Sequence, residues 1–167
     1  MTRRMPVVLA ALTVAAALGP ASLGAPAART IVPITIAGTT HRTTVVSPRL
    51  LEDTGTVKGS PIGSGSIVVH YALTPREAVA KVKWTITNAA GTVTGRAITR
   101  FTTTNLTITF TGRGRITGGT GRYAGIRSQP LAFNAKHSKT GKKEAIAFRG
   151  TGTLPAPGYG ASGPTRG

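Results

Sequence analysis

The strongest constraint on the fold of this chain is a two-residue alternation of side-chain character. In the segment 105–117, NLTITFTGRGRIT, the even-numbered residues are apolar or glycine and the odd-numbered residues are asparagine, threonine or arginine. A period of two is typical of a β-strand with one buried face. The buried face narrows to glycine at Gly112 and Gly114, which indicates a bend of the kind found at the corner of a barrel.

The same alternation recurs along most of the chain. In the segment 81–88, KVKWTITN, the residues Val82, Trp84 and Ile86 alternate with lysine and threonine. Further extended segments, separated by turns rich in Gly, Asn and Thr, are Gly63–Leu73, Gly91–Phe101, Gln129–His137 and Lys143–Leu154. The pattern predicts an all-β fold, either an antiparallel sandwich or a single antiparallel barrel.

Helical signals are confined to one short segment. Thr74-Pro75-Arg76-Glu77 has the form of a capping box with proline at the first helical position. Strand-like alternation resumes almost at once, so we expect a turn or a single helical turn between two strands.

The N-terminus has the order of a secretory signal peptide. Arg3 and Arg4 precede an apolar run, Val7–Leu18, which is followed by small residues up to Ala27. The run is shorter than the roughly 20 residues that a membrane span requires. We therefore expect cleavage after residues 1–27 and a secreted, extracellular protein. The chain has no cysteine, so its core must form without disulfides.

The remaining boundaries follow from composition. Pro33 interrupts a strand-like segment, and proline cannot donate to a central ladder, so residues 28–41 are expected to form an N-terminal arm or an edge strand. Residues 42–154 are expected to form the β-barrel domain. Residues 155–167, which are dense in Gly, Pro and Ala, are expected to be a disordered tail.

The chain is strongly basic. Its formal net charge is +17, and loss of the signal peptide with Arg3 and Arg4 lowers this to +15. Such a surface attracts polyanions, for example nucleic acid, an anionic wall polymer or an acidic membrane, but it is equally explained as solvation of a threonine-rich sheet. The candidate polyanion-binding residues are Lys81, Lys83, Arg113, Arg115, Lys136, Lys139, Lys142 and Lys143. No recognition element for sequence-specific DNA binding is present.

A glycine-rich segment, GGTGRYAG, follows the bent strand. It matches the pattern G-x-G-x-x-A of dinucleotide-binding loops, but no helical stripe follows it and Pro130 comes soon after. We therefore interpret it as a structural turn. Gly118 and Gly119 are expected to adopt positive φ, while Gly121 and Gly125 leave room for Tyr123 to pack against a neighbouring strand.

The segment 112–128, GRGRITGGTGRYAGIRS, resembles the G-x-I-x-G-G-T-G-x-[FY]-x-G-A-x-G segment of the barrel shared by allene oxide cyclases and dirigent proteins, and especially of small secreted bacterial relatives. The motif covers about 15 residues, and strand order extends the resemblance loosely over residues 42–154. The resemblance implies an eight-stranded antiparallel barrel with an apolar cavity, which is often a homotrimer. Independently, eight strands of about ten residues with short turns fit the segment 42–154.

Candidate catalytic groups are few. The candidate cavity residues are Tyr71, Trp84, Phe110, Phe133, Phe148 and His70, although inward aromatic side chains can equally just fill a small barrel. None of the four carboxylates, Glu52, Asp53, Glu77 and Glu144, is expected to point inwards, which argues against paired-carboxylate chemistry. The three histidines are scattered and show no metal-ligand spacing, so no metal or cofactor is expected.

Three functions remain open from the sequence. The first is a non-catalytic barrel that holds a small apolar or aromatic molecule. The second is a cationic barrel that binds an anionic polymer of the cell envelope through its exterior. The third is a cyclase or dirigent-type enzyme, which is implied by the resemblance and requires polar groups inside the barrel.

Overall fold

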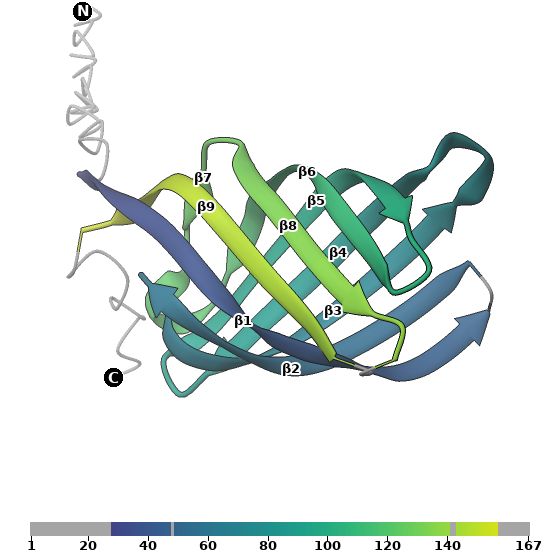
Figure 1. Ribbon diagram of the computed structural model, residues 1–167. Coiled ribbons are helices and arrows are strands. Elements are labelled where there is room, and N and C mark those ends of the chain that lie inside the picture. The colour runs from purple at the N-terminus through teal and green to yellow at the C-terminus, as the bar shows by residue number, and fades with distance from the viewer. Residues whose placement is uncertain (1–27, 48, 141–142, 157–167) are drawn as a thin grey trace, which may run out of the picture.

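The protein is an antiparallel β-barrel, seen from the side in Figure 1. The computed structural model describes residues 28–47, 49–140 and 143–156. Eight strands form the closed barrel and a short ninth strand, β7 (Arg127–Ser128), pairs with the last strand outside it. The eight are β1 (Arg29–Ser47), β2 (Leu50–Ser60), β3 (Gly63–Thr74), β4 (Val79–Asn88), β5 (Gly91–Thr103), β6 (Thr107–Gly119), β8 (Leu131–Ser138) and β9 (Lys143–Pro155). The predicted fold class is therefore confirmed.

The barrel closes through the pairing of β1 with β9, the first and last strands of the fold. This ladder runs from Arg29 opposite Pro155 to His41 opposite Lys143. From Thr35 onwards β1 also pairs with β2, so residues 29–41 form a strand, which was one of the two expected alternatives, and this strand belongs to the barrel and continues past the expected boundary at residue 42. Pro33 lies in the part of β1 that pairs with β9 but not with β2. Its missing N–H donor therefore does not interrupt the pairing with a second strand. The predicted signal peptide, residues 1–27, lies outside the described residues.

The barrel interior is filled by inward aromatic and aliphatic side chains. Trp84 and Phe148 have ring centroids 4.8 Å apart, and Phe148 meets Phe133 at 5.2 Å with an edge-on geometry. Tyr71 packs on Phe110, with ring centroids 4.9 Å apart. All five of these predicted inward aromatics are at most 2% exposed. The alternation in the sequence therefore identified the buried face correctly.

Trp84 owes its position to a glycine on the neighbouring strand. Gly95 is its register partner on β5, and a Cβ atom there would lie 2.0 Å from Cζ2 of the indole ring. The β5–β6 ladder also shifts register between Thr94 and Gly95, as at a β-bulge. The absence of a side chain at Gly95 is thus what allows the largest residue of the core to lie flat against the barrel wall.

The glycine-rich segment after β6 crosses the left-hand end of the barrel in Figure 1. It contains a short 3-10 helix, η2 (Gly121–Tyr123), in which Tyr123 is buried. The Tyr123 hydroxyl donates to the carbonyl of Ile62 at 3.0 Å and accepts from the side-chain amide of Asn88 at 2.9 Å. The prediction that Tyr123 packs against neighbouring strands is confirmed, and its segment ties the β2–β3 and β4–β5 turns together.

The expected backbone of this segment needs one correction. Positive φ occurs at Gly121 (56°) and Gly125 (75°), and not at Gly118 or Gly119. The latter two belong to the end of β6, where Gly119 is crowded by the carbonyl of Tyr123. The strand therefore continues further than expected, and the turn begins at Thr120.

Helices are minor. The segment Pro75–Glu77 forms a single 3-10 turn, η1, as predicted, although the Thr74 side chain does not cap it. Within the residues that the structure describes, no helix has the length and hydropathy needed to cross a membrane.

Replacing Gly95 by alanine tests the packing of Trp84. We expect Gly95→Ala to lower the free energy of unfolding by about 1–3 kcal/mol, because the indole ring must move off its position. Gly118→Ala is the matched control, since the nearest atom to its Cβ, Thr94 Oγ1, is 3.4 Å away, and we expect a change of about 0.5 kcal/mol or less. Urea denaturation followed by circular dichroism measures both, and equal losses would contradict the proposed contact.

Candidate functional site

Polar side chains gather inside the barrel near the end at which β1 ends and β2 begins. We call this group the polar cluster, and its members are Arg42 of β1, Asp53 of β2, Tyr71 of β3, His137 of β8 and Glu144 of β9. Alternation directs them inwards: Asp53 shares its face of β2 with Leu51 and Val57, and Glu144 shares its face of β9 with Ile146 and Phe148. Asp53 and Glu144 are fully buried, and His137 is 8% exposed.

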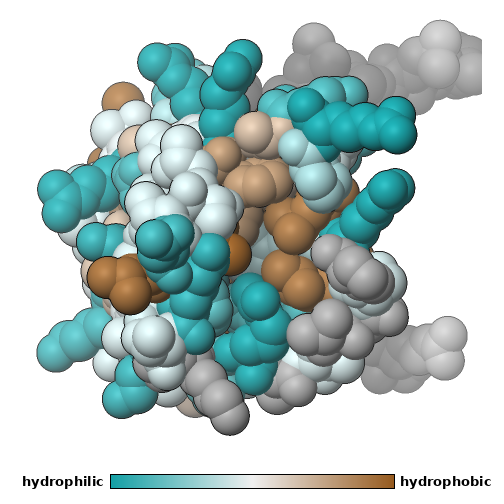
Figure 2. All heavy atoms as spheres, turned by 45° about the vertical axis from the view of Figure 1, so that its right-hand side comes forward, coloured by the Kyte–Doolittle hydropathy of each residue, from teal (hydrophilic) through white to brown (hydrophobic). Residues whose placement is uncertain are grey.

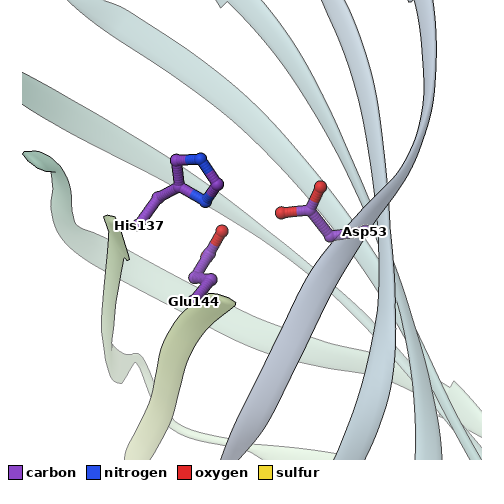
Figure 3. Close-up of side chains that lie close together, drawn as sticks. All are labelled: Asp53, His137 and Glu144. Carbon is purple, nitrogen blue, oxygen red and sulfur yellow. The ribbon is translucent and has the colours of Figure 1, made fainter. Parts of the chain in front are cut away.

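The contacts within the polar cluster leave three atoms without partners. Arg42 Nε donates to Asp53 Oδ1 at 2.9 Å, and the Tyr71 hydroxyl donates to Glu144 Oε1. As ionised groups, Asp53 Oδ2 and Glu144 Oε2 are buried without a hydrogen-bond donor among the described residues, and His137 Nδ1 is likewise buried without a partner. Figure 3 shows these three side chains pointing towards one another from different strands. Buried polar atoms in this condition are uncommon and mark a place where a proton or a ligand is expected.

The Glu144 carboxyl holds its proton near neutral pH. The pKa of Glu144 is raised from 4.5 to about 8, mainly by burial and also by a hydrogen bond with Asp53 and by the charge of Asp53. The hydrogen bond from Tyr71 and the charge of Arg42 act in the opposite direction on this pKa. Two carboxylates accept but cannot donate, so a proton on Glu144 is what lets the pair form a hydrogen bond.

Tyr71 and His137 of the polar cluster are neutral at pH 7. Burial, followed by the charge of Glu144, raises the pKa of Tyr71 well above its ordinary value of 10.0. Burial and the nearby Arg42 guanidinium lower the pKa of His137 below 6.5. The polar cluster therefore offers a protonated carboxyl, a phenol and a neutral imidazole beside one carboxylate, which is the inventory that general acid–base chemistry uses.

A divalent cation is the alternative occupant of this position. Two carboxylates and an imidazole are side chains that bind such ions, and one ligand atom from each of Asp53, His137 and Glu144 lies within 4.8 Å of the others. The positive charge of Arg42 repels a cation at this position, however. Arg42 already pairs with Asp53, and its charge also lowers the pKa values of His137 and Glu144. The described residues thus fit a proton better than a metal ion.

Apolar side chains also lie at this end of the barrel. Leu73 of β3, Phe101 of β5 and Ile108 of β6 are partly exposed and pack against the core at this end. Phe101 meets Phe110 with centroids 5.8 Å apart, and Phe110 in turn packs on Tyr71. Figure 2 brings this end of the barrel forward and shows a recess with hydrophobic residues exposed inside a hydrophilic rim. An amphipathic recess of this kind suits a small molecule with an apolar body and a polar group.

The sequence-based choice of site residues was partly wrong. His70 is exposed on the outer face of β3, where its Nδ1 lies 3.5 Å from Glu52 Oε2, and it does not line the interior. The expectation that no carboxylate points inwards was wrong for Asp53 and Glu144. Of the predicted aromatic set, Tyr71 belongs to the polar cluster. Whether any of these aromatics contacts a ligand stays a prediction.

The predicted exterior cations fall into two groups. Lys81, Lys83, Arg113 and Arg115 lie together on the outer face of β4 and β6, with Arg96 of β5 between them. Lys136, Lys139 and Lys143 are exposed around the β8–β9 hairpin and do not line that surface. Lys142 lies outside the described residues. Arg96 was not among the cations predicted from the sequence, although it lies between the inward residues Gly95 and Ala97.

Comparisons with known proteins leave the family of this chain open. No protein-family model and no curated protein sequence matches it. Among solved structures, it is similar to a pyocyanin demethylase at 19% sequence identity, covering 70% of this chain and 98% of that one, with a TM-score of 0.41. A likeness at that level carries no argument about activity. The barrel that the allene oxide cyclase resemblance implied is present, but a relationship to allene oxide cyclases specifically is not shown.

Stability is expected to depend on pH through Glu144. The pKa of Glu144 is about 8 in the folded protein against an ordinary value of 4.5, so its stabilising effect is complete below about pH 4.5 and is lost as the pH rises through about 8. Glu144→Gln keeps the shape and removes the titration. We expect the free-energy difference between wild type and Glu144→Gln to fall by at most about 1.4 kcal/mol per pH unit across this window.

Urea denaturation at a series of pH values measures this difference. Glu52→Gln, which replaces the neighbouring carboxylate on the outer face of β2, is the control and is expected to keep the wild-type slope. A Glu144→Gln variant with a pH dependence parallel to that of the wild type would show that Glu144 titrates normally.

Proposed function

We propose that the protein binds a small, largely apolar or aromatic molecule in the recess at the polar end of the barrel and transfers a proton to or from it. The observation that carries this proposal is the set of three buried polar atoms on Asp53, His137 and Glu144, which only a proton or a ligand can satisfy, beside a recess with apolar walls. An interior of this kind is what the third function left open by the sequence required.

The roles within the polar cluster follow from its contacts. Glu144 is the general acid, because its buried carboxyl is protonated and shares that proton with the Asp53 carboxylate. Tyr71 orients this carboxyl by donating to Oε1, so it is a positioning residue. Arg42 fixes Asp53 in turn, which leaves Asp53 Oδ2 able to accept the proton from Glu144 or from a bound molecule.

A proton pathway can be written with these groups alone. Glu144 gives its proton to a basic atom of the bound molecule and becomes a carboxylate that the Tyr71 hydroxyl and the Arg42 charge stabilise. The reverse transfer restores the starting state. Neutral His137 accepts a second proton through Nδ1 if the reaction also requires its removal from carbon. The chemistry that fits is isomerisation or proton abstraction on a small molecule, with no net change of oxidation state.

Binding is tested separately from catalysis. Native mass spectrometry of the purified protein is expected to show a reproducible added mass of a few hundred daltons, as for a ligand that fills part of a small barrel. Ile108→Lys places a charge in the apolar wall and is expected to abolish this mass. Leu106→Lys makes the same change in a side chain that is 64% exposed in the β5–β6 turn, and is expected to retain it. Loss in both variants, or no ligand in the wild type, would argue against a site in the recess.

Proton transfer is tested on the ligand so identified. Incubation in deuterated water followed by mass spectrometry measures exchange of carbon-bound hydrogen, and Glu144→Gln is expected to slow it by about 10²–10⁴ while the ligand remains bound. Glu52→Gln on the outer face is the control and is expected to exchange at the wild-type rate. Binding without any difference between these variants would leave a non-catalytic ligand-binding barrel, which is the first function left open by the sequence.

A further inference from the structure

A second surface, on the outside of the barrel and away from the polar cluster, has the form of a binding site. A groove of about 780 Å³ crosses the outer face of β4, β5 and β6, with residues 128–130 along its border. We call it the cationic groove, because its lining includes five basic side chains: Lys81, Lys83, Arg96, Arg113 and Arg115. All five are exposed.

The strand register places like charges opposite one another in the cationic groove. Lys83 of β4 is the partner of Arg96 of β5, and Arg96 is the partner of Arg115 of β6. Neighbouring strands are about 4.8 Å apart, so three cations span about 10 Å. Like charges directly opposite in a sheet are destabilising, so this row weakens the barrel when no anion is bound. A second row adds Lys81 and Arg113 on either side of Ile98.

No acidic side chain forms an ion pair with these charges in the described part of the chain. All four acidic side chains lie in the described part of the chain, with Asp53 and Glu144 inside the barrel and Glu77 in η1. Glu52 is on the outer face, but its ion pair is with His70. The ion pairs among the described residues are this one and Arg42–Asp53. The compensating anion of the cationic groove must therefore come from another molecule.

We propose that the cationic groove binds a linear phosphate polymer, with successive phosphates lying across the row formed by Lys83, Arg96 and Arg115. Arginine supplies the planar, forked donor group that matches the oxygens of a phosphate. The lining contains no aromatic side chain, which single-stranded nucleic acids use for base stacking, so a phosphate chain without bases is the better fit. A groove also encloses a single chain, whereas a lipid headgroup layer would meet only its rims.

Inorganic polyphosphate is the probe, and the full-length protein is the sample. Wild type is expected to bind it with a Kd that rises steeply with salt, because each phosphate contact releases counterions. The triple variant Lys83→Gln, Arg96→Gln, Arg115→Gln is expected to bind at least about tenfold more weakly, with a salt slope reduced by about 2. The matched control, Lys58→Gln, Arg122→Gln, Arg149→Gln, removes three exposed cations outside the groove and is expected to stay within about twofold of wild type.

Thermal unfolding of the same variants is an independent readout. Removal of the opposed charges is expected to leave the melting temperature unchanged or raised in the groove variant and in the single variant Arg96→Gln. Equal loss of binding in the two triple variants would show that affinity depends only on the net charge of the protein, which would overturn the proposal. Tighter binding of oligo-dT than of polyphosphate, or binding to anionic vesicles alone, would overturn it in favour of a nucleic acid or a membrane.

Discussion

The ladder between β1 and β9 is the interaction on which the rest of the structure depends. A twisted sheet of eight strands has two edges, and pairing the first strand with the last removes both of them. Closure also separates an inside from an outside, so the alternating residues of every strand are assigned either to a packed interior or to solvent. Without this ladder, the inward aromatic residues would lie on one exposed face of an open sheet.

The same closure creates the polar cluster. Arg42 and Asp53 come from the first two strands, and His137 and Glu144 from the last two, so the cluster lies across the seam where the chain meets itself. Burying carboxyl groups is costly unless they are paired, protonated or hydrogen-bonded. The ion pair with Arg42 offsets the cost of burying Asp53. For Glu144, the retained proton and the hydrogen bond from Tyr71 offset the cost of burial. The polarity is thus concentrated at one end, while aromatic packing fills the middle.

The strands β4 and β5 contribute side chains both to the barrel interior and to its outer face. Trp84 and Ala97 point into the interior, while Lys83 and Arg96 point into the cationic groove. The two proposed sites are built from different residues, because the polar cluster lies on β1, β2, β3, β8 and β9 and the basic side chains of the groove lie on β4, β5 and β6. Substitutions in one site leave the side chains of the other in place, which makes the two proposals independent.

How much could be read from the sequence differs between the fold and the site. Alternation alone identified an all-β chain, the inward aromatics and the outward lysines of β4, because a period of two fixes which residues share a face. The same alternation could have shown that Asp53 and Glu144 point inwards, because each is an even number of residues from the buried apolar residues of its strand. Pro33 led to a barrel boundary predicted too late in the sequence, because the sequence does not reveal that this part of β1 pairs with one strand only.

What only the tertiary structure decided is which distant residues meet. His137 and Glu144 face Asp53 because β8 and β9 return to the seam beside β1 and β2, and no local spacing records that return. The opposition of Lys83, Arg96 and Arg115 likewise depends on strand register, which is fixed by turns and by packing across the sheet. The sequence by itself determined the two faces of each strand, and barrel closure with its register determined the neighbours on each face.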